Sequence, residues 1–208
     1  MDSCCENKAC ALEALRERQG RTLKVVLAIN AVMFVVELGS GLMARSTALM
    51  SDALDNLGDA LTYGASLHAV PRGPEAKARV ALFKGALILL AGLFVLGQVA
   101  YRLAVPAQPI FEAMGAVGLL ALAANGACLA LLRKHRHEDV NMSSVWECSR
   151  NDIAANLAVL VAAGAVWLFD ARWPDLVVGG LLAALFLRSA LRVLRDASLA
   201  LRVARAAR

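Results

Sequence analysis

Aromatic residues and charges are scarce in this chain of 208 residues. Phe, Trp and Tyr make up 5% of it and charged residues 19%, whereas hydrophobic residues reach 59%, above the roughly 45–50% of a soluble domain. The apolar mass is therefore mostly Ala, Leu and Val, which is typical of lipid-facing helices. This composition excludes disorder, a collagen-like fibre and a small disulfide scaffold, and it argues against a soluble enzyme.

The chain also has few cysteines and a small net charge. The chain has five cysteines, an odd number, which argues against a secreted disulfide framework. Its net charge is only +5, which indicates loop charges at a membrane rather than a surface for nucleic acid. A cleavable signal peptide is not expected, because the first apolar run follows a charged segment and is too long for one.

Six segments are apolar enough to cross a bilayer, which takes about 20 residues. They cover 23–44, 46–70, 78–104, 110–133, 144–168 and 174–194. The second and fifth are the least hydrophobic, because each carries acids in its interior. We expect an all-α polytopic membrane protein with six transmembrane helices. Residues 1–20 would form a cytoplasmic head, 21–200 the membrane domain, and 201–208 a short basic tail that can continue the last helix.

The basic residues are distributed unevenly among the links between these segments. They gather before the first segment, after the second, after the fourth and at the C-terminus, whereas the alternate links carry little more than Arg45, Arg102 and Arg172. Basic loops stay in the cytoplasm, so this asymmetry predicts that both termini are cytoplasmic.

The second segment carries three aspartates. Asp55 and Asp59 are four residues apart, so a helix places them on one face, and Asp52 can join that face near the membrane edge. Two carboxylates held together in a low dielectric repel each other, and a divalent cation relieves the repulsion. We expect no buried basic residue that could neutralise the pair. The alternative is that these acids are structural partners of nearby polar groups.

The fifth segment repeats the spacing with Cys148 and Asp152. If the two pairs face each other, they supply three oxygen ligands and one thiolate, a tetrahedral set suited to zinc or a similar ion. Cys148 could instead be a small buried hydrophobe, and Cys128 is expected to be one. Other polar residues inside the segments could line a cavity or hydrogen-bond the ligands: Asn30, Glu37, Asn56, Asn125 and Asn151.

Several stretches together resemble the transmembrane domain of the cation diffusion facilitators, a family of divalent metal/proton antiporters. The resemblance covers about residues 21–200, and the acidic motif of the second segment is its most specific part. The stretches are Leu27-Ala-Ile-Asn30 with Val36-Glu37-Leu38-Gly39, Ser46-Thr-Ala-Leu-Met-Ser-Asp-Ala-Leu-Asp-Asn-Leu-Gly-Asp59, Asn125, Asp139-Val-Asn141 and Asp152.

The resemblance implies efflux of a divalent cation, zinc or cadmium first, in exchange for protons. Asp55, Asp59, Cys148 and Asp152 would occupy the four transport-site positions. It implies no enzyme activity and no cofactor, with membrane lipid, metal ions and protons as partners and the bacterial inner membrane as the location. Nucleic acid is not an expected partner.

Two departures from the family pattern matter. Cys148 stands where the family commonly has His, and a thiolate favours softer ions such as zinc, cadmium or mercury. Many family members also carry a soluble cytoplasmic domain after the sixth span, through which they dimerise. The chain ends before such a domain, so the resemblance does not imply dimerisation through it. Whether the chain forms a homodimer by another surface is left open.

Cysteines and histidines outside the segments are candidates for accessory metal capture. Cys4, Cys5 and Cys10 could pass metal to the membrane site, although their spacing matches no closed zinc motif and a reduced tail is the alternative. His135 and His137 could meet metal at the cytoplasmic mouth, but their basic neighbours favour a plain solvated loop.

Two other functions remain open. A membrane metal sensor or trapping protein would bind metal without transporting it. An intramembrane hydrolase would also use paired aspartates, but it would need a catalytic context such as Gly-x-Gly-Asp, which the sequence lacks.

Overall fold

The computed structural model describes residues 4–68, 73–133 and 142–206, and these ranges contain six α-helices. The helices are α1 (Cys4–Met43), α2 (Thr47–His68), α3 (Gly73–Ala104), α4 (Phe111–Arg133), α5 (Met142–Phe169) and α6 (Trp173–Ala206). The all-α class and the six helices are as the sequence predicts.

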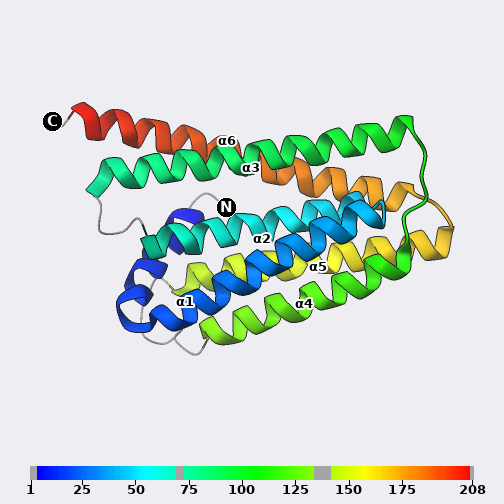
Figure 1. The fold of residues 1–208 in the computed structure, drawn as a ribbon, viewed down its shortest axis with the longest axis horizontal. Helices are drawn as coiled ribbons and strands as arrows, with labels where there is room; N and C mark the ends of the chain where they lie inside the picture. The colour runs from blue at the N-terminus through cyan, green and yellow to red at the C-terminus, as the bar shows by residue number, and fades with distance from the viewer. Residues whose placement is uncertain (1–3, 69–72, 134–141, 207–208) are drawn as a thin grey trace.

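The helices run back and forth along one long axis (Figure 1). α3 and α6 lie side by side and contact each other extensively, while α1, α2, α4 and α5 pack beside this pair. The turns from α1 to α2, α3 to α4 and α5 to α6 lie at one end of the molecule, on the right in Figure 1. The C-terminus lies at the opposite end, where α2 and α4 also finish.

Helix α2 is the centre of this arrangement. It contacts all five other helices, and every residue from 46 to 54 is buried. Its 22 residues give a length of about 33 Å, enough to cross the roughly 30 Å hydrocarbon layer. The surrounding helices shield its aspartates from lipid, which is how a helix this polar can lie within a membrane.

The six helices differ in hydropathy, and α2 is the one that is not apolar enough to be selected as a membrane span. In the described ranges five helices are long and apolar enough to cross a membrane, namely α1, α3, α4, α5 and α6. The outer surfaces of these helices carry large apolar side chains, including Val35, Leu90, Leu119 and Val161, each at least 60% exposed. So much exposed apolar surface suits lipid rather than water. The chain is a multi-pass membrane protein.

Two apolar clusters pack against the first half of α2. On one side Ala48 and Leu49 join buried side chains of α4, α5 and α6 that include Met114 and Val159. On the other side Met50 joins a smaller cluster with residues of α3 and α6. The core therefore lies at the end of the bundle where α2 begins, and the part of α2 beyond Leu54 lies outside these clusters.

Glycines set the close contact between α3 and α6. A Cβ atom at Gly85 would lie 2.9 Å from Cγ of Leu194, and one at Gly92 would lie 2.9 Å from Cδ2 of Leu187. Larger residues would push the helices apart, so these two glycines serve packing. At Gly39, by contrast, a Cβ would have no atom within 4 Å.

Two helices extend beyond the predicted spans. The backbone is helical from Cys4, so most of the expected head continues directly into the first span as part of α1. α6 runs on to Ala206, so the expected basic tail forms its last turns. Charged residues mark the ends of a membrane-spanning stretch, but they do not end a helix, because the backbone hydrogen bonds continue into water.

Candidate metal site

Helix α2 places Asp55 and Asp59 one turn apart, as their spacing predicts. Both are half-buried, whereas Asp52, one turn earlier, is fully buried. Asp152 lies in α5 and is also half-buried. The structure therefore provides a row of three carboxylates on the central helix and a fourth on a helix that contacts it.

Asn156 connects these two helices. Its Nδ2 donates to Oδ1 of Asp52 at 3.2 Å and to the backbone oxygen of Asp152 at 2.9 Å. Asp52 and Asp152 are close enough for their charges to interact. From α4, Nδ2 of Asn125 reaches Oδ1 of Asn156 at 3.5 Å. This chain of amides brings the acidic part of α2 beside the turn of α5 that carries Asp152.

The complete set of four predicted ligands is not assembled within the part of the chain that the structure describes. There, no three side chains of His, Cys, Asp or Glu lie together as a metal-binding group. Cys148 belongs to α5, but its side chain lies outside the described residues. The set of Asp55, Asp59, Cys148 and Asp152 therefore remains a prediction.

The accessory candidates cannot be placed around a metal either. Cys4, Cys5 and Cys10 lie in the helical backbone of α1, and their side chains are outside the described residues. His135 and His137 fall between α4 and α5, also outside them. Cys128 is buried, as expected, and lies 3.8 Å from Nδ2 of Asn30, which also donates to the backbone oxygen of Val26 at 2.8 Å.

Glu37 of α1 faces α2 rather than lipid. Its side chain is 0% exposed, and Nδ2 of Asn56 donates to both of its oxygens, at 2.9 and 3.0 Å. Asn56 is next in sequence to Asp55. Glu37 thus belongs to the buried polar interior of the bundle that also holds Asp52.

A basic side chain lies nearer to α2 than expected. Lys84, in the membrane-spanning part of α3, donates from Nζ to Oγ1 of Thr62. Thr62 is three residues beyond Asp59, so it lies about one turn farther along the same side of α2. Lys84 is half-buried rather than buried, and its hydrogen bond to Thr62 places its charge beyond Asp59, on the side away from Asp55.

Asp175 of α6 fixes the beginning of α2. Its two carboxylate oxygens accept from Oγ of Ser46 at 2.6 Å, the backbone N of Thr47 at 2.7 Å, Oγ1 of Thr47 at 2.9 Å and the backbone N of Ala48 at 3.1 Å. A helix leaves its first backbone N–H groups without partners, and a carboxylate there also suits the helix dipole. Asp175 therefore caps α2 from a neighbouring helix.

The next turn of α6 tightens the same contact. Oγ of Ser51 donates to the backbone oxygen of Gly179 at 2.7 Å. A Cβ atom on Gly179 would lie only 2.5 Å from Oγ1 of Thr47 and 2.6 Å from its backbone carbonyl carbon. The α2 and α6 backbones can approach this closely only because residue 179 is glycine.

The comparisons with known proteins identify the family. A family model described as the cation efflux transmembrane domain matches residues 23–202. The chain belongs to the cation efflux family. This confirms the resemblance to the cation diffusion facilitators and the fold it implies.

Relatives of this cation efflux chain include the metal cation efflux system protein CzcD of Cupriavidus metallidurans, at 25% identity over 195 residues, covering 85% of the chain and 62% of CzcD. The zinc transporter ZitB of Yersinia pestis is 24% identical over 196 residues, covering 87% and 62%. A cadmium, cobalt and zinc/H(+)-K(+) antiporter of Bacillus velezensis is 23% identical over 195 residues, covering 85% and 62%. The chain thus spans about three fifths of the length of these relatives.

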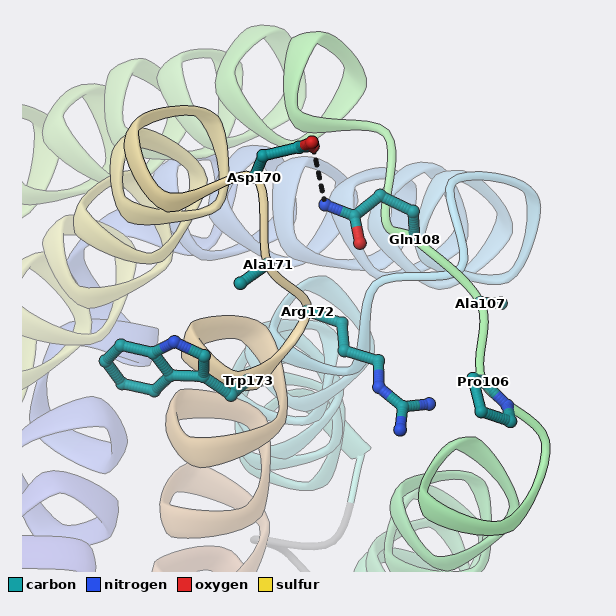
Figure 2. A pocket seen from close by; sticks show the side chains of 7 residues that line it. All are labelled: Pro106, Ala107, Gln108, Asp170, Ala171, Arg172 and Trp173. Atoms are coloured by element: carbon teal, nitrogen blue, oxygen red, sulfur yellow. Dashed lines mark hydrogen bonds between the residues drawn. The ribbon is translucent and has the colours of Figure 1, made fainter.

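A surface depression of the cation efflux domain lies elsewhere. It has a volume of about 500 Å³ and lies between the α3–α4 and α5–α6 links (Figure 2). Asp170 is its only acid, and Nε2 of Gln108 donates to Oδ1 of Asp170 at 3.4 Å. Arg172 adds a positive charge and donates from its guanidinium to the backbone oxygen of Arg102 at 3.0 Å. One acid beside an arginine is a poor cation site, so this depression does not suit a metal ion.

Two residues that position α2 against its neighbours were not predicted from the sequence, Asn156 and Asp175. Asn156 lies four residues after Asp152, the same spacing that drew attention to Cys148 and Asp152, so a longer search along that face would have found it. Asp175 lies directly after Pro174 at the start of α6, where an acid normally stabilises the N-terminus of its own helix. Its capping of α2 depends on how α2 and α6 pack together, and the local sequence around Asp175 does not indicate it.

Proposed function

We propose that this chain exports a divalent heavy-metal cation, zinc or cadmium, in exchange for protons. Asp55, Asp59, Cys148 and Asp152 would be the ligands. The observation that carries the proposal is the Asn156 bridge, which holds the acidic part of α2 beside Asp152 in the interior of the bundle. The names of the relatives, which include a zinc transporter and a cadmium, cobalt and zinc/H(+)-K(+) antiporter, support the same class of cargo.

Charge drives the binding step. Three carboxylates and a thiolate in a protein interior repel one another, and a divalent cation bound among them removes most of that repulsion. The ligands must be deprotonated to coordinate, so metal binds when the site faces the cytosol at near-neutral pH and has lost its protons. Since α2 is shielded by the other helices, water-filled access to the site has to open between helices.

Protons drive the release step. When the site faces the other side, protons compete for the same oxygen and sulfur atoms, and the ion leaves. Rocking of helices about a fixed central site would give this alternating access. The counter-transported protons thus replace the positive charge that the metal carries away.

Cys148 sets the preferred cargo. A thiolate prefers softer ions, so zinc, cadmium and mercury are favoured over magnesium and manganese. Replacing it with histidine supplies a nitrogen ligand and should weaken the preference for cadmium relative to zinc.

The proposed setting is a bacterial inner membrane with both termini in the cytosol. Basic residues are concentrated in the links at the end where the chain terminates, and this supports a cytoplasmic location for that end. Residues 1–20 would form a cytoplasmic extension of α1 and 201–208 of α6, around the transport domain of 21–200. All four proposed ligands come from one chain, so a homodimer is compatible with the mechanism but is not required by it. We expect no enzymatic reaction and no cofactor.

Metal uptake into proteoliposomes across an imposed proton gradient tests the proposal. The ions are zinc, cadmium, mercury, cobalt and manganese, and the variants are Asp59→Asn, Asp152→Asn and Cys148→His. We expect the two aspartate variants to lose flux by about 10-fold or more, since changing even the hydrogen-bond partners of metal ligands costs about 10–100-fold. Asp196→Asn, at an exposed position of α6, is the matched control and should transport normally.

Two results would contradict the proposal. Wild-type flux in Asp152→Asn would remove that residue from the transport site. Tight binding without flux of any ion would favour a metal sensor or trapping protein, in which Cys4, Cys5 and Cys10 could take part.

A further inference from the structure

Glu37 and Asp52 form a buried acidic cluster with two amides, Asn56 and Asn156. All four side chains are at most 1% exposed. Both Glu37 oxygens accept from Asn56, and Oδ1 of Asp52 accepts from Asn156. The two acids come from different helices, α1 and α2, and their charges are close enough to interact. Neither acid is among the four proposed metal ligands.

Two acceptor atoms in this cluster lack a donor. Oδ2 of Asp52 and Oδ1 of Asn56 are buried and have no hydrogen-bond partner among the described residues. The two residues are four apart on α2, so their side chains lie one turn apart on the same face. Leaving a buried polar atom without a partner is destabilising, because the atom has lost its hydrogen bonds to water. Because both atoms are acceptors, what is missing is a donor or a cation.

The cluster's own donors are already used. The Nδ2 group of Asn56 faces Glu37, and that of Asn156 faces Asp52 and the backbone of Asp152. The cluster therefore contains two carboxyl groups and two amides with no positive charge of its own. Two carboxylates without a cation are strongly disfavoured in such an interior.

Among the residues that the structure describes, the charged groups on the neighbouring helices do not fill this gap. Asp152 of α5 adds negative charge, and α4 contributes only the neutral amide of Asn125. Asp175 of α6 is already bonded to the start of α2. Lys84 of α3 bonds Thr62, which is ten residues along α2 from Asp52, or roughly 15 Å.

We propose that Asp52, Asn56 and Glu37 form a proton site that is separate from the metal ligands. A proton on Oδ2 of Asp52 makes that atom a donor to Oδ1 of Asn56, so one O–H bond satisfies both unpartnered acceptors. This inference rests on the proposed metal/proton exchange and adds a proton carrier to it. Asp52 is three residues from Asp55 and is linked to Asp152 through Asn156, so charge at the metal site acts on this proton.

The carrier would work in step with the metal. A cation arriving beside Asp152 repels the proton on Asp52, the O–H bond breaks, and the proton leaves to the cytosol. When the metal departs on the other side, the negative charge of the neighbouring carboxylates draws a proton from that solution, and the O–H bond forms again. One proton thus moves opposite to the metal without ever sharing an atom with it.

Calorimetry of cadmium and of zinc binding to the purified full-length protein tests the inference. Titrations in buffers of different protonation enthalpy give both the metal affinity and the number of protons released per ion. In Asp52→Asn we expect the number of protons released per ion to fall by about one. The metal affinity should change much less than the roughly 10-fold or greater decrease expected when a ligand is removed. The exposed-site control Asp196→Asn should leave both quantities unchanged.

Glu37→Gln supplies a second variant in case Asp52→Asn does not fold, with Glu112→Gln at the exposed start of α4 as its control. Glu37→Gln removes one of the two carboxyl groups of the proton site, so the proton count should fall here too. An unchanged count in the folded variant would overturn the inference and indicate that water fills the cluster. A 10-fold weaker affinity with an unchanged count would assign these acids to the metal site instead. Failure of the wild type to transport metal would contradict the proposed function rather than this addition to it.

Discussion

Asp175 shows, at the scale of single residues, how one carboxylate can determine where a functional helix begins. Its two oxygens accept from four donors, one on Ser46 just before α2 and three on the first two residues of α2, and it is only 1% exposed. Two of these donors are backbone N–H groups that would otherwise be buried without partners. The position of the aspartates farther along α2 therefore depends on a residue of α6 that lies far from them in sequence.

We predict that Asp175→Ala lowers the free energy of unfolding by about 3 kcal/mol or more, because it leaves several buried donors unpaired. Thermal unfolding of the purified protein in detergent measures this. The control is Asp170→Ala, since Asp170 is exposed and makes one long hydrogen bond of 3.4 Å. It should change stability by less than about 0.5 kcal/mol. Equal melting temperatures for the two variants would show that Asp175 does not hold α2 in place.

Part of the site was predictable from single residues and part was not. The face shared by Asp55 and Asp59 follows from helical spacing alone, so the sequence predicted it correctly. The contacts of Asn156 with Asp52, and of Asp175 with Thr47, depend on which faces of different helices meet. One sequence carries no direct record of that. Lys84 was missed for the same reason, because its partner Thr62 lies on another helix.

At the scale of elements, the contact between α2 and α6 is the closest approach in the bundle for which a glycine is required. Gly179 meets the backbone of Thr47, whereas the adjacent Gly180 has room, since a Cβ there would lie 3.9 Å from Val99. The two neighbouring glycines therefore provide a matched pair of substitutions on the same helix.

Gly179→Ala should destabilise the protein by roughly 1–3 kcal/mol, because the added methyl group forces α2 and α6 apart. Gly180→Ala should be neutral or slightly stabilising, since alanine favours a helix by up to about 1 kcal/mol over glycine. Unfolding in detergent compares them directly. If Gly179→Ala were as stable as Gly180→Ala, the close approach of the two backbones would be in doubt.

The sequence predicted the elements better than their ends. All six helices lie over the predicted segments, and five of them are long and apolar enough to cross a membrane, α2 being the exception. The start of the first helix was predicted too late in the chain and the end of the sixth too early, because α1 already begins at Cys4 and α6 continues to Ala206. Apolar runs report the thickness of the membrane, not the length of the helix.

At the scale of the whole molecule, alternating helix directions place the α3–α4 and α5–α6 links at one end and the C-terminus at the other (Figure 1). The distribution of basic residues predicts that the end with the C-terminus is cytoplasmic. Gln108 lies in the α3–α4 link and Val203 near the end of α6, and both are exposed.

Cysteine labelling in intact cells checks this orientation. In a variant whose five native cysteines are replaced, Gln108→Cys should react with a membrane-impermeant maleimide. Val203→Cys should react only after the membrane is permeabilised. The opposite pattern would invert the proposed direction of transport, and labelling of both in intact cells would contradict the six-span topology.

The central claim is that α2 and α5 hold one metal ion between them through three carboxylates and the Cys148 thiolate. X-ray absorption spectroscopy of the cadmium-loaded protein tests it most directly, in a variant with Cys4, Cys5 and Cys10 changed to Ser and Cys128 to Ala. We predict one sulfur neighbour with oxygen atoms completing the shell, and loss of the sulfur signal when Cys148 is also changed to Ser. A cadmium shell of oxygen and nitrogen alone with Cys148 intact would contradict the account.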